Sequence, residues 1–383
     1  MGLRFFTSGE SHGYGILAFI EGLPSGLRID LDFVNIELRR RQLGFGRGGR
    51  MKIEFDEATF LSGVYRGETV GAPITILVRN RDWENWKDIM DPFCYRDSKS
   101  FFVPRPGHAD LPGALKYNIR DLRAILERAS ARETAGRVAG GAIFKLFLKE
   151  FGINIASYVK RIGPVEMERK PSWEEMISID DDPLRCPDRE VSEKMVECIK
   201  RAIEEGDTLG GVFVVTARNV PVGLGSHVQW DRRLDARIAM AMMSIQGVKA
   251  VSIGEILEDR DLKGSNFHDE IYYSKSKGFY RLTNRAGGIE GGITNGEDIV
   301  VYCYMKPIPT LRNPLRSVNI LTKEPSEAHR ERSDVSAVAA ASIVGEAMLA
   351  FVLADAILEK FGSDNMRDII ANYENYINEV KNF

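Results

Sequence analysis

The chain contains 383 residues, of which 44% are hydrophobic and 28% are charged, and its formal net charge is −3. This composition supplies one large hydrophobic core or two smaller ones, and it excludes a polyanion-binding surface spread over the whole protein. No run of 18 uncharged apolar residues occurs, and the first residues lack a signal-peptide pattern, so we expect a cytoplasmic protein without a membrane partner. The widely spaced Cys94, Cys186, Cys198 and Cys303 predict free thiols and no metal site.

A glycine-rich stretch at residues 7–15, TSGESHGYG, lies near the start of the chain. Apolar runs at 3–6 and 16–20 flank it, so a loop between two strands is predicted. The glycines allow the backbone to approach a ligand, and Ser11 and His12 place a hydroxyl and a titratable base there. A polar hairpin loop with a solvated histidine is the alternative that this stretch alone leaves open.

A helix is predicted at residues 31–42, with Asp30 or Asp32 as its cap. Three consecutive arginines, the last of which is Arg41, occupy its final turn. If Glu37 pairs with Arg41 one turn away, these arginines are simply part of a solvated helix end. The alternative is that they contribute to an anion site.

The loop at residues 43–50 carries Arg47 and Arg50 among several glycines. It matches the G-x-G-x-x-G pattern, but that pattern should follow a strand and open a helix. Here it follows the predicted helix and precedes a strand-like run, which excludes a dinucleotide-binding fold. A flexible loop remains, whose arginines have no acidic partner nearby in the sequence.

Strands are predicted at residues 60–64 and 74–78, and a long polar connection follows them. It ends at residues 103–110, VPRPGHAD, where two prolines and a glycine restrict the backbone around Arg105 and His108. A rigid loop with these two side chains is suited to a site, and an exposed turn is the alternative.

A single long helix is predicted at residues 119–150, followed by a glycine stop at Gly152. Arg128 and Arg132 lie on one face of it and have no acid three or four residues away, so an anion from elsewhere is expected beside them. Many small residues keep this helix slender, which indicates a central position with close packing. The predicted i, i+4 pairs are Arg123 with Glu127 and Glu133 with Arg137.

The rest of the chain alternates between strands and helices too irregularly for a parallel βαβ series. We therefore predict an α+β fold, a sandwich with central helices between antiparallel sheets. Ser333 or Asp334 is expected to cap a long helix whose N-terminus, beside Arg332, would attract an anion. The predicted strands are 153–162, 211–218, 249–253 and 299–305, and the helices are 192–205 with Ile203 inward, one capped by Asp231, 335–361 and 365–380.

Clustered arginines in a slightly acidic protein favour one enclosed site for a multiply charged anion, because guanidinium groups repel one another without a ligand between them. His12 and His108 are candidates for proton transfer near that charge. Motifs of serine hydrolases, zinc proteases and P-loop enzymes are absent from the sequence. The residues thus indicate an enzyme for a phosphorylated or polycarboxylate small molecule, and a nucleic-acid or other polyanion-binding protein is the alternative.

Several segments in order resemble the chorismate synthase family over essentially the full length of the chain. Residues 9–13, 128–134 and 332–334 resemble three signatures of that family. The other matching segments are 39–42 with 47–50, 105–110, 291–293 and 306–310.

The resemblance implies one domain over residues 1–383 with the sandwich fold of that family. It also implies a 1,4-anti elimination of phosphate from 5-enolpyruvylshikimate 3-phosphate to give chorismate. Reduced FMN would be an obligatory cofactor that is not consumed and donates an electron transiently. An external flavin reductant is expected, although reduction by the protein itself from NADPH stays open, and a homotetramer is expected from the family.

The resemblance also implies roles for individual residues. His12 would donate a proton toward the N1 and O2 region of the flavin, His108 would protonate the departing phosphate, and Asp334 would relay the proton from flavin N5. The implied substrate ligands are Ser11, Arg41, Arg47, Arg50, Arg105, Arg132 and Arg332. The implied flavin contacts are Arg128, Ala129, Ser130, Gln246, Gly247, Gly291, Lys306, Pro307, Ile308, Pro309, Thr310 and Arg332.

Two of these positions depart from the family pattern, since Gly247 stands where alanine is expected and Ala129 where many members have serine. Both replacements are small, so they alter the expected pocket little. No role is implied for His227, His268 and His329, which we expect to be structural or exposed.

Overall fold

The computed structural model describes residues 2–47, 55–93, 99–258, 261–331, 334–362 and 364–383. Helices and sheets are both present along the chain, and each strand pairing within the named sheets is antiparallel. The prediction of an α+β fold is therefore confirmed.

The first sheet has four strands in the order β1-β2-β6-β3 and comes from the start of the chain. The predicted strands at 3–6, 16–20, 60–64 and 74–78 are all present, with ends displaced by a few residues. The short strands β4 (Val64–Tyr65) and β5 (Glu68–Thr69) form a hairpin before β6. The four main strands are β1 (Arg4–Ser8), β2 (Gly15–Glu21), β3 (Ala58–Ser62) and β6 (Ile74–Arg79).

The second sheet has five strands in the order β10-β15-β9-β7-β8 and is built from the middle and end of the chain. Its four longer strands match the predicted ones within a residue. They are β7 (Asn154–Ile162), β9 (Gly211–Arg218), β10 (Val248–Ile253) and β15 (Ile299–Met305), with the short β8 (Val165–Glu166) at the edge.

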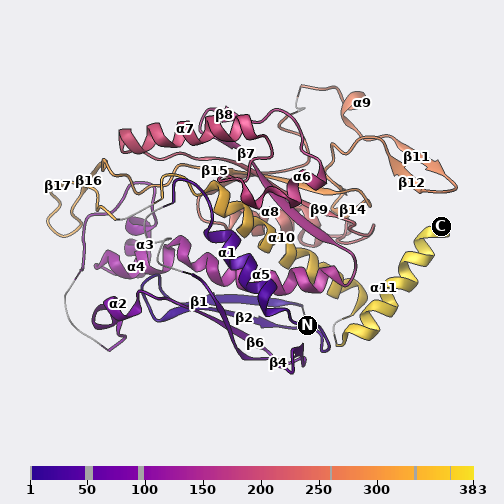
Figure 1. Ribbon diagram of the computed structural model, residues 1–383, viewed down its shortest axis with the longest axis horizontal. Helices are drawn as coiled ribbons and strands as arrows, with labels where there is room; N and C mark the ends of the chain where they lie inside the picture. The colour runs from indigo at the N-terminus through magenta and orange to yellow at the C-terminus, as the bar shows by residue number, and fades with distance from the viewer. Residues whose placement is uncertain (1, 48–54, 94–98, 259–260, 332–333, 363) are drawn as a thin grey trace.

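Three helices lie between these two sheets in Figure 1: α1 (Leu31–Gln42), α5 (Thr134–Lys149) and α10 (Val338–Phe361). Helix α5 contacts β1, β2 and β6, α10 contacts β7 and β9, and α5 and α10 pack on each other. A Cβ at Gly141 would lie only 2.2 Å from Cβ of Ala347, so glycine is required where α5 and α10 meet. The predicted close packing around the small residues is confirmed.

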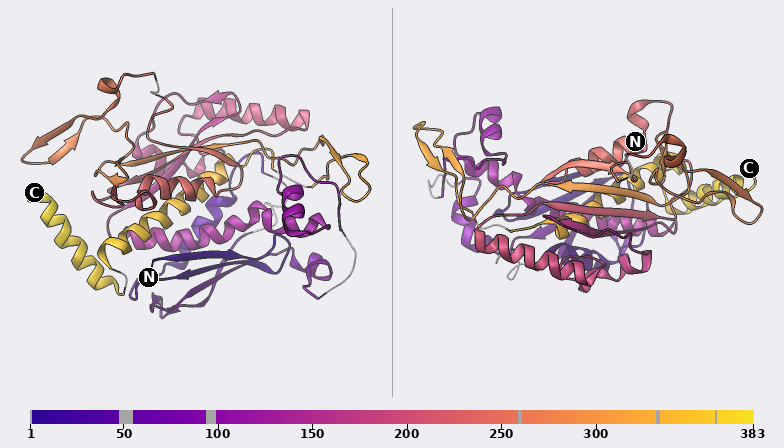
Figure 2. Two further views of the ribbon diagram at one scale, coloured as in Figure 1. Left: turned by 180° about the vertical axis from the view of Figure 1, so that it is seen from behind. Right: turned by 90° about the horizontal axis from the view of Figure 1, so that it is seen from above.

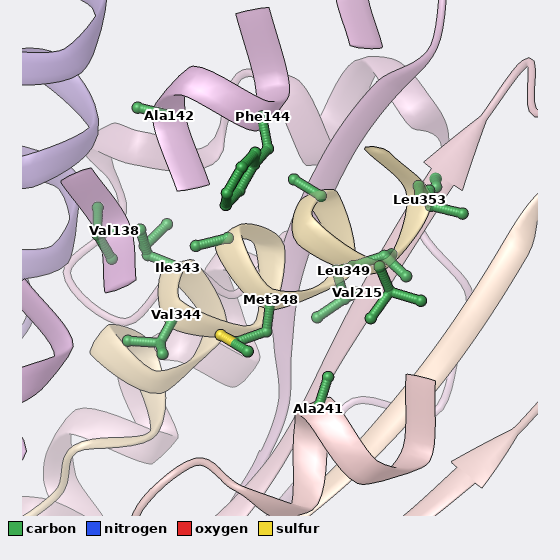
Figure 3. Close-up of a cluster of buried hydrophobic side chains, with 14 of the residues drawn as sticks. Val138, Ala142, Phe144, Val215, Ala241, Ile343, Val344, Met348, Leu349 and Leu353 are labelled. Carbon is green, nitrogen blue, oxygen red and sulfur yellow. The ribbon is translucent and has the colours of Figure 1, made fainter. Parts of the chain in front are cut away.

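Apolar side chains from both central helices and from the second sheet interlock in the core (Figure 3). By length and composition, α10 could cross a membrane, but 89% of its most apolar stretch is buried inside the protein. Its hydrophobicity is thus accounted for by the core. The labelled residues in Figure 3 are Val138, Ala142 and Phe144 of α5, Ile343, Val344, Met348, Leu349 and Leu353 of α10, Val215 of β9, and Ala241 of α8 (Leu234–Met243).

The prediction of one uninterrupted helix at 119–150 is wrong. The segment forms α4 (Leu122–Ala129), a 3₁₀ turn η2 (Ala131–Glu133) and α5. The break falls at Ser130, which is extended and whose hydroxyl accepts a hydrogen bond from the Arg132 backbone N–H. Serine favours such local capping over helix propagation, and here the chain leaves the helix at this cap.

Two helix starts differ from the predictions, and the residue at the N-cap position makes no side-chain capping hydrogen bond in either. Helix α8 follows the 3₁₀ turn η4 (Trp230–Arg232) with Arg233 at its N-cap position, so Asp231 is not its cap. Helix α10 begins after Ala337, so Asp334 does not cap it, and Ser333 lies outside the described residues. The side chain of Ile203 is not inward but 38% exposed. The cap of α1 at Asp30 is as expected, and α11 (Met366–Lys381), predicted at 365–380, is capped by Asn365.

Further elements lie outside the two sheets. In Figures 1 and 2, the hairpin of β11 and β12 projects near helix α11, while β16, β17, α2 and α3 gather at the opposite end. Helices α2 and α3 fall in the polar connection and the expected turn, where no helix was predicted. These elements are α2 (Trp83–Met90), α3 (Asp110–Tyr117), α6 (Trp173–Ile177), η3 (Ile179–Asp181), α7 (Arg189–Glu205), α9 (Gly264–Phe267), β11 (Ile271–Ser274), β12 (Gly278–Arg281), β13 (Ile289–Glu290), β14 (Ile293–Thr294), β16 (Arg316–Val318) and β17 (Pro325–Glu327).

Candidate active site

One of the residues that hold the glycine-rich loop between β1 and β2 is the asparagine that directly follows β6. The Asn80 side-chain amide donates to the carbonyl oxygens of Gly13 at 2.6 Å and Ser11 at 3.1 Å. Its oxygen accepts a hydrogen bond from Nε of Arg132 at 2.8 Å. Asn80 therefore joins the loop that carries His12 to the residues just before α5.

His12 is buried between a carboxylate and an indole ring. Its Nδ1 lies 2.8 Å from Oε1 of Glu127, and its backbone N–H donates to Oε2 of the same side chain at 2.8 Å. The imidazole stacks on Trp86 of α2, with ring centroids 3.8 Å apart. The solvated-histidine alternative is therefore excluded, since His12 has only 8% of its surface exposed.

Two serines and an arginine extend this cluster across the helix break. The Ser130 hydroxyl donates to the Ser11 hydroxyl at 3.1 Å. Arg128 reaches back from α4 and donates to the carbonyl oxygens of Thr7 at 2.8 Å and Gly9 at 3.2 Å. The guanidinium of Arg128 is thus tied to the loop backbone while it remains exposed.

Arg41 and Arg132 share one buried carboxylate. NH2 of Arg41 and NH1 of Arg132 each lie 2.6 Å from an oxygen of Asp56. The expectation of an anion from elsewhere beside Arg132 is confirmed, since Asp56, which lies 76 residues away in the sequence, faces its guanidinium group. The alternative in which Glu37 pairs with Arg41 at a solvated helix end is excluded, since Glu37 pairs with Arg40 at 2.7 Å and Arg41 is buried.

The positive charge around Arg41 exceeds what Asp56 compensates. Burial lowers the pKa of Arg41, and repulsion from Arg132 and Arg47 adds to this effect against the attraction of Asp56. The Nε of Arg41 is buried and has no hydrogen-bond partner among the described residues. This region can therefore accept a further anion.

A second cluster surrounds the proline-bounded loop before α3. Arg105 forms a two-point contact with Asp110, from Nε at 2.8 Å and from NH2 at 3.0 Å, and its NH1 donates to the Thr310 hydroxyl at 3.0 Å. Nδ1 of His108 lies 2.6 Å from Oδ1 of Asp110. The exposed-turn alternative is excluded for Arg105, which is 6% exposed.

Lys306, which follows β15 directly, also belongs to the second cluster. Its ammonium group donates to the carbonyl oxygen of Gly107, and its backbone N–H donates to the carbonyl oxygen of Gly247 at 2.9 Å. Burial, followed by repulsion from Lys249, lowers the pKa of Lys306. Two ammonium groups near one another favour a negatively charged ligand.

A cavity of 510 Å³ is lined in part by Thr310, Glu331 and Asp334. Thr310 belongs to the Arg105 cluster. Nε of Arg47 lies 3.1 Å from Oδ2 of Asp334, which links the cavity wall to the loop after α1. Segments from five distant parts of the sequence thus meet at one end of the molecule.

The other residues expected to contact the flavin lie in several different parts of the structure. Gln246 donates to Glu133 at 3.0 Å, and its Oε1 is buried without a hydrogen-bond partner among the described residues. Ile308 accepts a hydrogen bond from Thr208 at 2.7 Å, and Pro307 and Pro309 flank it. Ala129 ends α4 beside Ser130. Gly291 lies exposed in the turn of the β13–β14 hairpin, and no described contact joins it to the two clusters.

The remaining expected residues lie outside the site or outside the described structure. Arg50 and Arg332 are not among the described residues. His227 and His268 are exposed, as expected. His329 is structural, because its ring stacks on Phe101 with centroids 3.9 Å apart.

Four residues that position the site were not predicted as site residues: Asp56, Asn80, Asp110 and Glu127. Each is the polar partner of a predicted arginine or histidine. Asp110 carried a sequence signal, because it follows His108 by two residues in a restricted loop. The other partners become visible only after folding, since they lie far along the chain from the groups that they contact.

Buried guanidinium groups lie beside two histidines that are held by carboxylates. This arrangement is typical of an enzyme pocket that binds a small polyanion and exchanges protons with it. The sequence pattern of the family described as chorismate synthase matches residues 3–358. The chain belongs to the chorismate synthase family, and its activity is that of a lyase that forms chorismate.

Individual relatives agree with this assignment. The chorismate synthase of Aquifex aeolicus is 56% identical, with 100% of this chain and 99% of that protein covered. The one from Geobacter sulfurreducens is 55% identical, with 100% of both chains covered. A solved structure titled "Crystal Structure of Chorismate Synthase" superposes with a TM-score of 0.82 at 47% identity, covering 100% of this chain and 99% of the other.

Proposed function

We propose that the pocket formed by the two clusters catalyses the 1,4-anti elimination of phosphate from 5-enolpyruvylshikimate 3-phosphate, with reduced FMN bound beside the substrate. The observation that carries this proposal is a set of contacts around one cavity. Asp334 and Thr310 in its wall contact Arg47 and Arg105, and Arg105 contacts the Asp110 carboxylate that holds His108. Glu331 in the same wall binds Arg123, which binds the Glu127 carboxylate that holds His12, while Arg41 shares Asp56 with Arg132 and is repelled by Arg47. The substrate has two carboxylates and a phosphate, which match a pocket with several guanidinium groups.

Substrate binding is assigned to Arg41, Arg47, Arg105 and Arg132, to Ser11, and to Arg50 and Arg332 by sequence resemblance. The Nε of Arg41, which has no hydrogen-bond partner among the described residues, supports this role, because a buried donor without an acceptor is costly until a ligand supplies one. Asp56 and Asp110 would then hold Arg41, Arg132 and Arg105 in place.

His108 is the proposed general acid for the departing phosphate. Its Nδ1 faces the Asp110 carboxylate, which can only accept hydrogen bonds, so Nδ1 carries a proton that it donates to Asp110. Proton transfer to the phosphate would then take place at Nε2. Arg105 lies beside the same ring and would bind the phosphate that His108 protonates. A histidine in this role contributes about 10²–10⁴-fold to the rate.

The pocket offers suitable groups for FMN. The buried Oε1 of Gln246, which has no hydrogen-bond partner in the described part of the chain, can accept from a ring N–H, and Lys306 with Lys249 can bind an anionic group. Reduced FMN would supply transient electron density to the substrate. The other residues assigned to hold it are Arg128, Ala129, Ser130, Gly247, Gly291, Arg332 and the segment Pro307, Ile308, Pro309 and Thr310.

His12 and Asp334 are the groups of this chain assigned to proton movement around the cofactor. His12 would donate toward the N1 and O2 side of the flavin, where negative charge accumulates. Asp334 would take a proton and pass it on, and Arg47 beside it would hold the carboxylate in position. Both roles rest on the sequence resemblance.

The wider assignments are also part of the proposal: one domain over residues 1–383, the sandwich architecture of the family, a cytoplasmic homotetramer and an external flavin reductant. One main core cluster that includes residues from Leu3 to Ile369 supports the single domain. The outer face of the first sheet supports an interface, since Phe6, Phe19 and Leu61 are 54%, 37% and 56% exposed there.

A nucleic-acid-binding role is disfavoured by burial. Arg41, Arg105 and Arg132 are 4%, 6% and 7% exposed, so they cannot follow the phosphates of a polymer across a surface. The test of the proposed function is phosphate release from 5-enolpyruvylshikimate 3-phosphate under anaerobic conditions, with dithionite-reduced FMN and with oxidised FMN. Release only with reduced FMN supports the proposal, and release that is equal with oxidised FMN contradicts it.

A further inference from the structure

Glu127 directs both oxygens of its side chain at one residue. Oε2 accepts the backbone N–H of His12 and Oε1 lies at Nδ1 of the same residue, each at 2.8 Å. The backbone carbonyl of Glu127 also accepts the N–H of Ser11 at 3.0 Å. With 1% of its side chain exposed, this carboxylate binds the loop and the ring together without competition from water.

The His12 ring is further restricted on its face and around its partner. Trp86 stacks on the imidazole, and the Lys99 ammonium lies 3.6 Å from the centroid of the Trp86 ring. NH1 of Arg123 lies 3.4 Å from Oε1 of Glu127 and 3.2 Å from Oε2 of Glu331. Rotation of the imidazole would therefore break its contact with Glu127 and disturb its stacking on Trp86.

We propose that Glu127 is a positioning residue for His12, which keeps a proton on Nδ1 and thereby confines proton exchange by this ring to Nε2. A carboxylate can only accept hydrogen bonds, so the 2.8 Å contact requires N–H at Nδ1. The link from this geometry to catalysis rests on the proposed function, in which His12 is a proton donor. The tautomer itself does not depend on it.

The charged groups around the pair belong to three parts of the chain. Arg123 comes from the same helix, Lys99 from the segment between α2 and α3, and Glu331 from the segment before α10, with His329 3.5 Å from Glu331. Arg123 binds both carboxylates, so Glu127 and Glu331 are held by one guanidinium. Among the described residues, Glu127 is the carboxylate that contacts Nδ1, and its chemistry therefore determines the tautomer.

Replacement of Glu127 by glutamine tests this assignment with little change in shape. The amide has one oxygen, which the backbone N–H of His12 requires, so the amide N–H₂ then faces Nδ1. Two donors cannot face each other, and Nδ1 must become an acceptor with the proton moved to Nε2. Glu127→Asp keeps an acceptor-only group and is the conservative variant, while Glu10→Gln removes an exposed carboxylate of the same loop as a matched control.

The measurement is the ¹H–¹⁵N correlation spectrum of ring-labelled histidine in the full-length protein without flavin, at alkaline pH where the imidazoles are neutral. Five histidines are present, and His12→Ala identifies the signal of His12. We expect the Nδ1–H tautomer in the wild type, Glu127→Asp and Glu10→Gln, and the Nε2–H tautomer in Glu127→Gln. A wild-type Nε2–H signal, or no difference in Glu127→Gln, overturns the proposal, and the wild-type spectrum alone decides if that variant does not fold.

The kinetic consequence is a selective loss of turnover. A catalytic histidine held in the wrong tautomer loses up to about 10⁴-fold in kcat, so Glu127→Gln should lower kcat at least about 10²-fold while KM for the enolpyruvyl substrate stays within about threefold. Glu127→Asp should recover a large part of kcat. If the wild type releases no phosphate with reduced FMN, the proposed function fails, whereas the tautomer spectrum still decides the role of Glu127.

Discussion

Nδ1 of His108 lies 2.6 Å from the Asp110 carboxylate, two residues away at the start of α3. The same carboxylate accepts a two-point contact from Arg105. Burial alone would raise the pKa of Asp110, but hydrogen bonds from His108 and Arg105 hold it well below its usual range. Asp110 therefore stays ionised and orients an anion-binding group and a proton donor together.

His108→Ala should lower turnover about 10²–10⁴-fold while substrate affinity is largely kept, because the variant lacks the proton donor but retains the arginines. Phosphate release under saturating reduced FMN measures turnover, and equilibrium binding of the substrate measures affinity. Unchanged turnover would remove His108 from the mechanism.

Asp110→Asn should destabilise the fold by about 2–4 kcal/mol, because it leaves the buried Arg105 guanidinium without its anionic partner. The comparison is Asp32→Asn, which changes an exposed carboxylate in the first turn of α1 and should cost below about 1 kcal/mol. Urea unfolding of the two variants gives both values. Equal losses would show that the Asp110 contact contributes no more than a surface charge.

Arg132→Ala should weaken substrate binding more than flavin binding, in line with its assignment to the substrate. It should also destabilise the protein by about 3 kcal/mol, because the buried Asp56 carboxylate would lose one of its two described guanidinium partners and keep Arg41. Titrations of each ligand together with urea unfolding separate the two effects. A variant that loses stability but binds both ligands as the wild type does would make Arg132 purely structural.

The strands of both sheets and the central helices were predictable because their apolar periodicity is local. The break at Ser130 was not, since the flanking alanines and arginines favour a helix. Its cause includes a contact with Ser11, 119 residues earlier, and a cap to the backbone of Arg132. Contacts with distant residues thus help to determine where α4 ends, which local helix propensity does not predict.

The charged groups of the site were predictable, but their partners were not. Arg132 was expected to face an anion from elsewhere, but the sequence did not identify Asp56, which lies 76 residues away, or the further partner Asn80, which lies 52 residues away. Glu127 was assigned to Arg123 on the same helix, which is correct, but its contact with His12 spans 115 residues. Sequence spacing identifies pairs within a helix and gives no information on pairs that form only when distant segments meet.

Acid should destabilise the protein through Glu331 and Asp110. Burial would raise the pKa of Glu331, but the hydrogen bond from His329 and the charge of Arg123 lower it from 4.5 to about 2. A carboxyl group with a lowered pKa stabilises the fold above its ordinary pKa and loses this contribution as pH falls through the folded-state value. Unfolding free energy should therefore drop between about pH 4.5 and pH 2. Glu331→Gln should flatten this part of the curve, and a slope identical to that of the wild type would contradict the assignment.

The outer face of the first sheet should carry an interface between copies of the chain. Phe6 and Phe19 are cross-strand neighbours on β1 and β2 and are both exposed, so a second copy would bury them together. Phe19→Glu places a charge in this patch and should shift a tetramer to smaller species, because an unpaired carboxylate is costly to bury. Light scattering after size exclusion measures the mass. Ile177→Glu, at a position 58% exposed on α6, is the control for adding a charge at another apolar surface residue, and a Phe19→Glu protein with unchanged mass would place the interface elsewhere.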